Sequence, residues 1–212
     1  MVSSQFKNRV RIIGLTGGIA SGKSRAARFL VWRFGPLFHS ADKTAHDLLE
    51  PGREGWRLIR GISPDFIYPD GTVNKVFLRS ALFEDEGLRS KVNGELHPLV
   101  WQALEKKIKD QSSFTEQVSV LVEVPLLYEA GWEDRFDRVI VVFARRKSCL
   151  VRLVSRDNVS GPQAERELTV QMPLPDKCLL ADHVVDNSGT WTRTLPELLH
   201  LGNILWPPGQ TS

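Results

Sequence analysis

The sequence predicts an α/β fold in which a parallel five-stranded sheet lies between layers of helices. Short apolar runs rich in β-branched residues alternate with helix-like segments along much of the 212-residue chain, and this alternation is typical of parallel strands joined by crossover helices. The first apolar run stops at a glycine-rich turn that opens into a helix-like segment, as a buried parallel strand does. With 42% hydrophobic residues, the chain has enough apolar surface for one core domain with small insertions.

The first elements follow in order from this pattern. Val10 to Leu15 is mostly apolar and forms the first predicted strand, and Ser24 to Phe34 has apolar residues at helical spacing before Gly35-Pro36 ends it. Pro36 to His39 is the second predicted strand, and the helix after it continues to about Leu49. The residues that follow the second strand therefore lie at a carboxyl end of the sheet.

Three later runs complete the predicted sheet, at Val118 to Val124, Asp137 to Phe143 and, more weakly, His183 to Asp186. The core is therefore expected to comprise residues 10–53, 115–145 and 181–203. Between them, residues 54–114 are predicted to be a helical insertion punctuated by turns, including one at His97-Pro98. Residues 146–180, which are rich in arginine, are predicted to be a helical lid, and residues 204–212 a flexible tail.

Composition excludes some functional classes and leaves others open. The net charge of +3 and a pI near 9.0 suit a phosphorylated ligand or a nucleic acid without choosing between them. The two cysteines, Cys149 and Cys178, have no C-x-x-C spacing, so we expect reduced thiols and no zinc site. No export signal or apolar run of about 18 residues is visible, and we expect a cytoplasmic protein that does not enter a membrane.

A phosphate-binding motif follows the first strand. Residues 17–24 read Gly-Gly-Ile-Ala-Ser-Gly-Lys-Ser and fit the pattern G-x-x-x-x-G-K-[ST]. Glycines let successive N–H groups face phosphate oxygens, and the N-terminus of the next helix adds partial positive charge. In this pattern Lys23 reaches the β and γ phosphates and Ser24 offers its hydroxyl to Mg²⁺. Such a pattern also arises by chance in unrelated loops, but the strand before it and the helix after it are the context that the motif requires.

The motif alone leaves ATPase, GTPase and small-molecule kinase open. Asn74-Lys75-Val76-Phe77 lacks the Asp of a guanine-reading N-K-x-D signature, which disfavours a GTPase. Asp42 follows the second strand, where it suits two tasks equally well. Its carboxylate can accept a proton from an acceptor hydroxyl, or it can cap the helix that begins near Lys43.

Further motifs occur in a fixed order along the chain. They are Leu15-Thr16-Gly17-Gly18-Ile19, Ala41-Asp42, Asp70-Gly71-Thr72-Val73, His97-Pro98, Val124-Pro125-Leu126-Leu127-Tyr128-Glu129, Arg152 with Arg156-Asp157, Gln171 with Lys177, and Ala181-Asp182 before Val185-Asp186-Asn187. In this order and spacing the chain resembles the dephospho-CoA kinase family from about Ile12 to Gly189. The order and spacing carry the resemblance, because no single short piece does.

The resemblance implies a three-layer P-loop kinase fold whose helical insertion binds the acceptor. It also implies transfer of the γ-phosphoryl group of ATP to the ribose 3′-hydroxyl of dephospho-CoA, the last step of coenzyme A synthesis. ATP and Mg²⁺ are the expected cofactors, and dephospho-CoA is the expected small-molecule partner. We expect no nucleic-acid partner, and a monomer or weak homo-oligomer.

The family's roles transfer to matching positions. Asp42 is then expected to be the general base, because a ribose hydroxyl is a poor nucleophile and such a base typically contributes about 10²–10⁴-fold. Lys23 and Arg156 are the other expected catalytic residues, Arg156 by stabilising charge on the transferring phosphoryl group. Arg152 lies four residues before Arg156, on the same helix face. The alternative interpretation is that this face is a solvated surface with no role in phosphate binding.

Binding residues are expected in three groups. The nucleotide-binding residues are Gly17, Gly18, Ile19, Ala20, Ser21, Gly22, Lys23, Ser24, Arg25 and Arg152. The acceptor-binding residues are Thr16, Lys75 and His97, although a histidine before proline is often only part of a turn. Ser24 is the expected metal ligand. Glu123 is expected to influence the metal without binding it directly, and a partly buried structural role is the alternative for Glu123.

Several positions depart from the family's pattern. Ala20 replaces a usual glycine, so we expect position 20 to avoid a positive φ, which alanine resists. Arg25 replaces a small hydroxyl residue, Ser40 replaces an Asp, and His46 and Lys75 each replace an Arg. Imidazole lacks the fixed charge and the fork of guanidinium, so these changes leave both weaker acceptor binding and neutral drift open.

Two other functions compete with the kinase implied by the resemblance. Another P-loop nucleoside or nucleotide kinase shares the phosphate loop, the acid after the second strand and a basic lid. A non-catalytic nucleotide-binding protein is suggested by Ser40, His46 and Lys75. A DNA- or RNA-binding module is disfavoured, because the basic residues cluster in a segment that phosphate closure explains better.

Overall fold

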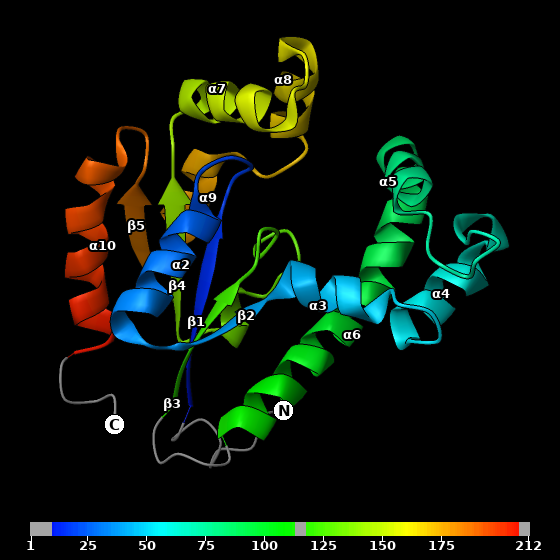
Figure 1. The fold of residues 1–212 in the computed structure, drawn as a ribbon, viewed down its shortest axis with the longest axis horizontal. Helices are drawn as coiled ribbons and strands as arrows, with labels where there is room; N and C mark the ends of the chain where they lie inside the picture. The colour runs from blue at the N-terminus through cyan, green and yellow to red at the C-terminus, as the bar shows by residue number, and fades with distance from the viewer. Residues whose placement is uncertain (1–9, 113–117, 208–212) are drawn as a thin grey trace. The chain divides into compact units, whose positions relative to one another are not determined.

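The computed structural model describes residues 10–112 and 118–207. Within these residues one sheet contains five strands in the order β2-β3-β1-β4-β5, as Figure 1 shows. The strands are β1 (Val10–Gly17), β2 (Leu37–Ser40), β3 (Val118–Glu123), β4 (Arg138–Phe143) and β5 (His183–Asp186). β1 pairs in parallel with both β3 and β4, and β4 pairs in parallel with β5. The predicted α/β fold with a five-stranded parallel sheet is confirmed.

The described residues also form helices. They are α2 (Lys23–Phe34), α3 (Ala41–Leu48), α4 (Glu54–Ile62), α5 (Lys75–Glu84), α6 (Glu86–Ser112), α7 (Arg146–Asp157), α8 (Gly161–Thr169), α9 (Leu174–Leu180) and α10 (Trp191–Leu205), with short 3-10 helices η1 (Pro64–Phe66) and η2 (Glu133–Arg135). By compactness the chain divides into unit 1, Met1–His39 with Ser112–Ser212, and unit 2, Ser40–Gln111.

The core of unit 1 lies against the face of the sheet that α2 and α10 cover (Figure 1). Ile13, Leu15, Leu121, Ile140 and Val142 point into this core from alternate positions of three adjacent strands. Their neighbours on the opposite face are buried as well, at Ile12, Val120, Val122, Val139 and Val141. Burial on both faces explains why these strands are continuous apolar runs rather than alternating ones.

The strand order creates a switch point beside β1, which lies between β3 and β4. The connection from β1 leads to β2 on one side, and the connection from β3 leads to β4 on the other. In open α/β sheets the loops diverge at such a point and leave a crevice at the carboxyl ends of the strands, where ligands bind. The loop after β1 is the predicted phosphate loop, so the fold places that motif where a ligand is expected.

The predicted lid, residues 146–180, does not form one substructure. α7 packs against α8, and an ion pair between Arg146 and Glu165 joins them. α9 instead packs against β4, and its Lys177 side chain is completely buried. Residues 174–180 therefore belong with the core, because a buried lysine ties them to it.

Unit 2 is helical and has a small core of its own around Ile59, Phe66, Val73, Leu78 and Val92. It begins at Ser40, earlier than the predicted insertion at residue 54. The reason lies in α3, which packs against α4 and is bonded to α6 through Lys107, whose Nζ lies 3.3 Å from Thr44 Oγ1 and 3.0 Å from Asp47 Oδ2. The expected last insertion residues, 113 and 114, lie outside the described residues.

The expected break at His97-Pro98 is wrong, because α6 continues through both residues from Glu86 to Ser112. A proline inside a helix removes one backbone hydrogen bond and typically costs about 3 kcal/mol. After Pro98, however, α6 carries Val100, Trp101, Leu104 and Ile108, which are all buried. Tertiary packing of this face outweighs the local penalty.

The expected tail starts too early. α10 extends to Leu205, and Leu205 and Trp206 are both buried, with the Trp206 ring stacked 5.9 Å from that of Phe34. These apolar side chains complete the core beneath α2, so residues 204–206 are structural. The expected tail residues 208–212 lie outside the described residues. None of the described helices is both long and apolar enough to cross a membrane.

Candidate active site

The phosphate loop connects β1 to α2 and depends on two glycines that no other residue can replace without a clash. Gly17 has φ +155°, and a Cβ there would lie 2.6 Å from the Val142 carbonyl oxygen. Gly22 has φ +96°, and a Cβ there would lie 2.1 Å from Asn187 Nδ2. Both distances are far below contact, so the motif's glycines are required by close approach as well as by backbone conformation.

Ala20, in the middle of the loop, adopts φ +57°. The expectation that position 20 avoids a positive φ is therefore wrong. A left-handed residue other than glycine typically costs about 1–2 kcal/mol, and such strain persists where the surroundings hold the backbone. Ile19 and Ser21, on either side of Ala20, are both held from outside the loop, as described next.

The carbonyl oxygen of Ser21 accepts two side-chain hydrogen bonds. Asn187 Nδ2 donates to it over 2.7 Å, and Arg152 Nη1 over 3.4 Å. Asn187 is buried and is itself fixed by Thr194, whose hydroxyl donates to Asn187 Oδ1 over 3.0 Å. Arg152 also donates to the Asn187 carbonyl over 2.7 Å. The loop after β5 and the first lid helix therefore hold the phosphate loop together.

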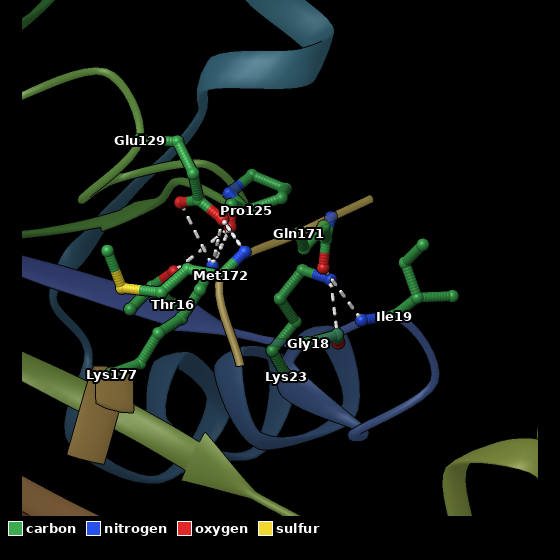
Figure 2. Close-up of polar contacts among 9 residues, drawn as sticks. All are labelled: Thr16, Gly18, Ile19, Lys23, Pro125, Glu129, Gln171, Met172 and Lys177. Atoms are coloured by element: carbon green, nitrogen blue, oxygen red, sulfur yellow. Dashed lines mark hydrogen bonds and ion pairs between the residues drawn. The ribbon is translucent and has the colours of Figure 1, made fainter. Parts of the chain in front are cut away.

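The amide of Ile19 donates to Gln171 Oε1 over 3.1 Å, and Lys23 Nζ lies 3.5 Å from the Gly18 carbonyl oxygen (Figure 2). Lys23 is the first residue of α2, and its side chain turns back over the loop. A cation at this position suits the phosphate role predicted for Lys23.

Ser24 and Glu123 meet at the switch point, although they are 99 residues apart in sequence. The Ser24 hydroxyl donates to Glu123 Oε1 over 2.6 Å, and Glu123, the last residue of β3, is only 8% exposed. A hydroxyl beside a carboxylate forms a pair of oxygen donors of the kind that Mg²⁺ prefers. The residues that were expected to act on the metal therefore fit that ion.

The two lid arginines have different partners. Arg152 contacts backbone carbonyls of the phosphate loop and of the loop after β5. Arg156 is exposed and forms a two-point contact with its neighbour Asp157, from Nε over 2.7 Å and from Nη2 over 2.8 Å. This hydrogen bond raises the pKa of Arg156 further above its ordinary value. Arg152 is thus part of the loop's framework, whereas Arg156 lies on the lid surface.

Two of the predicted contact residues have structural partners. Thr16 was expected to contact the acceptor, but its side chain is completely buried and its hydroxyl donates to the Pro125 carbonyl oxygen over 3.2 Å. That expectation is wrong, because Thr16 has no surface left for a substrate. The guanidinium of Arg25 lies 4.1 Å from the centre of the Trp191 ring, a cation–π contact, and its expected role in nucleotide binding stays a prediction.

Asp42 lies in the first turn of α3 in unit 2, and its side chain is exposed. The helix cap is Ser40, whose side-chain oxygen accepts from the Lys43 amide over 3.3 Å. Capping was the alternative role for Asp42, and Ser40 already fills it. The family's Asp at position 40 is thus replaced by another good capping residue.

The expected acceptor residues Lys75 and His97 also lie in unit 2. Lys75 Nζ is hydrogen-bonded to His46 Nε2, so two of the departures from the family's pattern form a pair. His97 lies inside α6, where burial lowers its pKa below the ordinary value of 6.5, so it offers hydrogen bonds rather than charge at neutral pH.

Sequence reasoning assigned no role to four residues that the structure places around the phosphate loop, namely Glu129, Gln171, Lys177 and Asn187. All four stand in motifs that carry the family resemblance, and Asn187 directly follows β5. Their positions after strands and at the end of the lid were the available signal. Their partners, more than 40 residues away in each case, could not be read from local spacing.

Comparison with known proteins agrees with this geometry. A family model described as dephospho-CoA kinase matches residues 11–193. Dephospho-CoA kinase of Geobacter sulfurreducens is 35% identical over 182 residues, which are 85% of this chain and 91% of that protein. That of Symbiobacterium thermophilum is 35% identical over 186 residues, 87% of this chain and 77% of that protein.

Solved structures give the same fold. A protein from Thermus thermophilus aligns with a TM-score of 0.77 and 26% identity over 93% of this chain and 97% of its own. Dephospho-CoA kinase from Campylobacter jejuni aligns with a TM-score of 0.67 and 21% identity over 93% of this chain and 98% of its own, which supports the fold alone. Because the family model spans most of the sequence and the relatives match most of it at above 30% identity, this chain belongs to the dephospho-CoA kinase family.

Proposed function

We propose that this chain transfers the γ-phosphoryl group of ATP to the ribose 3′-hydroxyl of dephospho-CoA, giving CoA and ADP. The observation that carries the proposal is the phosphate loop between β1 and α2 in a chain matched by the family model over residues 11–193. The loop supplies backbone amides and a helix N-terminus for phosphate oxygens. Family membership supplies the acceptor, which the loop by itself does not specify.

Lys23 is the residue proposed to hold the β and γ phosphates. Its ammonium group already lies against the loop, near the Gly18 carbonyl, so a phosphate bound by the loop amides meets a nearby cation. Positioning and charge stabilisation supply most of the catalysis in phosphoryl transfer. Lys23→Ala is expected to impair ATP binding directly.

Ser24 and Glu123 are the residues proposed to hold Mg²⁺, with the Ser24 hydroxyl as ligand and Glu123 orienting it. Bound Mg²⁺ neutralises charge on the phosphate oxygens during transfer. Glu123→Gln keeps an oxygen acceptor for Ser24 and removes the negative charge. We expect this variant to need more Mg²⁺ for half-maximal activity while binding ATP normally without metal. An unchanged Mg²⁺ requirement would contradict this role.

Asp42 is the proposed general base, and Arg156 the proposed stabiliser of charge on the transferring group. The role of Asp42 is supported by its exposed carboxylate and by the presence of Ser40 as the helix cap. For Arg156 the support is an exposed guanidinium on α7 whose partner, Asp157, is its sequence neighbour. An exchange of this local partner for a phosphoryl oxygen requires no core rearrangement.

An acceptor panel tests the function. Purified protein is incubated with ATP and Mg²⁺ and with dephospho-CoA, uridine or nucleoside monophosphates, and ADP formation is followed. We expect dephospho-CoA to be the preferred acceptor. Faster phosphorylation of uridine or a nucleoside monophosphate would contradict the assignment, and tight ATP binding without turnover on any acceptor would favour a non-catalytic protein.

A substitution at Asp42 tests the mechanism. Asp42→Asn is expected to lower kcat by roughly 10²-fold or more, since it removes the base, and to leave ATP binding intact. Asp110→Asn is the matched control, because Asp110 is exposed in the same unit and forms a surface ion pair with Lys106. Normal kcat in Asp42→Asn would show that Asp42 is not the base. The expected cytoplasmic location and the expected monomer or weak homo-oligomer stay predictions.

A further inference from the structure

The apex of the phosphate loop, residues 19–21, is held from both sides by the segment predicted as the lid. Gln171 accepts the Ile19 amide over 3.1 Å, and Arg152 donates to the Ser21 carbonyl over 3.4 Å. Ala20, between these two contacts, has the unfavourable φ of +57°. The residue under strain therefore lies between one contact from α7 and one from the connection between α8 and α9.

Gln171 does not reach the loop by chance, because its own backbone is pinned. The amide of Met172, the next residue, donates to Glu129 Oε1 over 3.0 Å (Figure 2). The same carboxylate pairs with Lys177, whose Nζ lies 2.8 Å from Oε1 and 3.0 Å from Oε2. Lys177 is completely buried, and removing one partner of a buried pair is strongly unfavourable. The ion pair therefore anchors the chain on which Gln171 stands.

This anchor also reaches the start of the phosphate loop. Lys177 Nζ donates to the Pro125 carbonyl oxygen over 3.0 Å, and the same oxygen accepts from the Thr16 hydroxyl over 3.2 Å. Thr16 precedes Gly17, where the loop begins. Both the start of the loop and its apex thus connect to the Glu129–Lys177 pair through the hydrogen bonds drawn in Figure 2, the apex by way of the Gln171–Met172 backbone.

We propose that Gln171, anchored by the Glu129–Lys177 pair, is a positioning residue that holds the phosphate loop in its ATP-binding conformation. The inference rests on the proposed function and deepens it. Gln171 acts through Ile19 by keeping Ala20 at its positive φ, and the Gln171–Ile19 hydrogen bond persists when ATP binds. Without this bond the loop relaxes to a negative φ at Ala20 and its amides no longer converge on phosphate.

The alternative role for Gln171, in which it competes with phosphate, predicts the opposite change in ATP affinity. If Gln171 only occupied the Ile19 amide until a phosphate oxygen displaced it, its removal would tighten ATP binding. The contacts of Met172 and Lys177 argue against such displacement, because they hold the backbone next to Gln171 through Glu129 and Pro125, outside the phosphate loop. The direction of the change in ATP affinity therefore decides between the two roles.

The size of the effect follows from Ala20. Alanine favours a negative φ by at least about fivefold, so without Gln171 about one sixth of the protein keeps a competent loop and the apparent Kd for ATP rises about sixfold. Glycine has no such preference. In an Ala20→Gly background about half of the protein is competent, and Gln171→Ala is then expected to raise Kd only about twofold.

The experiment measures the Kd for ATP by titration calorimetry, without acceptor, for the wild type, Gln171→Ala, Ala20→Gly and the double variant. Gln163→Ala is the matched control, because Gln163 is an exposed glutamine on α8 in the same segment. We expect Gln171→Ala alone to weaken ATP binding, with kcat at saturating ATP and the KM for dephospho-CoA unchanged. Since no acceptor is present in the titration, its result stands even if dephospho-CoA is not the substrate.

Tighter or unchanged ATP binding in Gln171→Ala would overturn the proposal, and so would an equal loss in the Ala20→Gly background, because the coupling to Ala20 would then be absent. Glu129→Gln tests the anchor. We expect it to weaken ATP binding in the same direction and to add little to Gln171→Ala, because both act through one connection. If the losses of ATP affinity in the two variants were fully additive, Glu129 would not act through Gln171.

Discussion

A methyl group at Gly22 would meet the side-chain amide of Asn187, and this clash gives a prediction with a defined magnitude. The added Cβ would lie 2.1 Å from Asn187 Nδ2, at a backbone φ of +96°. Asn187 cannot move away without breaking its 2.7 Å bond to the Ser21 carbonyl and its 3.0 Å bond from Thr194. Gly22→Ala is therefore expected to destabilise the protein through both backbone strain and lost hydrogen bonds.

The backbone part is about 1 kcal/mol for a left-handed alanine, and two lost hydrogen bonds add about 1 kcal/mol each. The total, about 3 kcal/mol, corresponds to a decrease in Tm of roughly 6–12 °C for a chain of this size. Differential scanning calorimetry measures this shift. We also expect ATP binding to weaken, because the Ser21 carbonyl in the phosphate loop loses the shorter of its two side-chain hydrogen bonds.

Gly35→Ala is the matched control. Gly35 has φ +72°, but a Cβ there would have no neighbour within 4 Å, so this variant reports the backbone strain alone. In an Asn187→Ala background the clash is gone, and Gly22→Ala should then cost only as much as Gly35→Ala. The reasoning is refuted if Gly22→Ala is no more destabilising than Gly35→Ala, or if its full effect persists without Asn187.

Three further predictions concern stability. Ala20→Gly removes the strain at φ +57° and is expected to stabilise the protein by about 1 kcal/mol in urea denaturation; a loss of stability would contradict the strain. Trp206→Ala should destabilise by about 3–5 kcal/mol, since it empties a buried site, whereas Trp32→Ala at a 78% exposed site should change little in the same assay. The hydrogen bond from Lys107 lowers the pKa of Asp47 below 3.8, so this pair stabilises the folded state above about pH 4 and the stabilisation is lost as pH falls through the lowered pKa. Lys107→Met should flatten the acid side of a stability profile measured by denaturation from pH 2 to 7, and an unchanged profile would exclude the pair as its source.

Much of the fold follows from local patterns. Val10–Leu15, Val118–Val124 and Asp137–Phe143 were predicted as strands within two residues of their observed ends, because strands buried on both faces are continuous apolar runs. The phosphate loop was also predicted from the sequence. Its glycines and its lysine all lie within eight consecutive residues, so the motif can be recognised without knowledge of distant contacts. Pro98 shows the limit of such rules, because packing of the following helical face overrides the local preference of proline.

Some features of the candidate site were likewise predicted from the sequence, and others were not. Lys23, Ser24 and Asp42 were predicted as site residues from motif positions. Glu123 was predicted to act on the metal beside Ser24, with a structural role as the alternative, and the structure adds the hydrogen bond between these two side chains. The paired contact of His46 with Lys75 was not expected, although both positions had been noted as departures from the family's pattern. A hydrogen bond between side chains 29 residues apart depends on how the helices of unit 2 pack.

The sequence by itself determined the phosphate loop, the parallel sheet and the family, because each depends on residue types at short or regular spacing. Only the tertiary structure decided what holds the loop. It placed Thr16 against Pro125 instead of a substrate, gave Ala20 a positive φ, and joined Ile19 to Gln171 across 152 residues. These outcomes come from packing between distant segments, whose contact energies offset local backbone strain, and local spacing contains no record of such contacts.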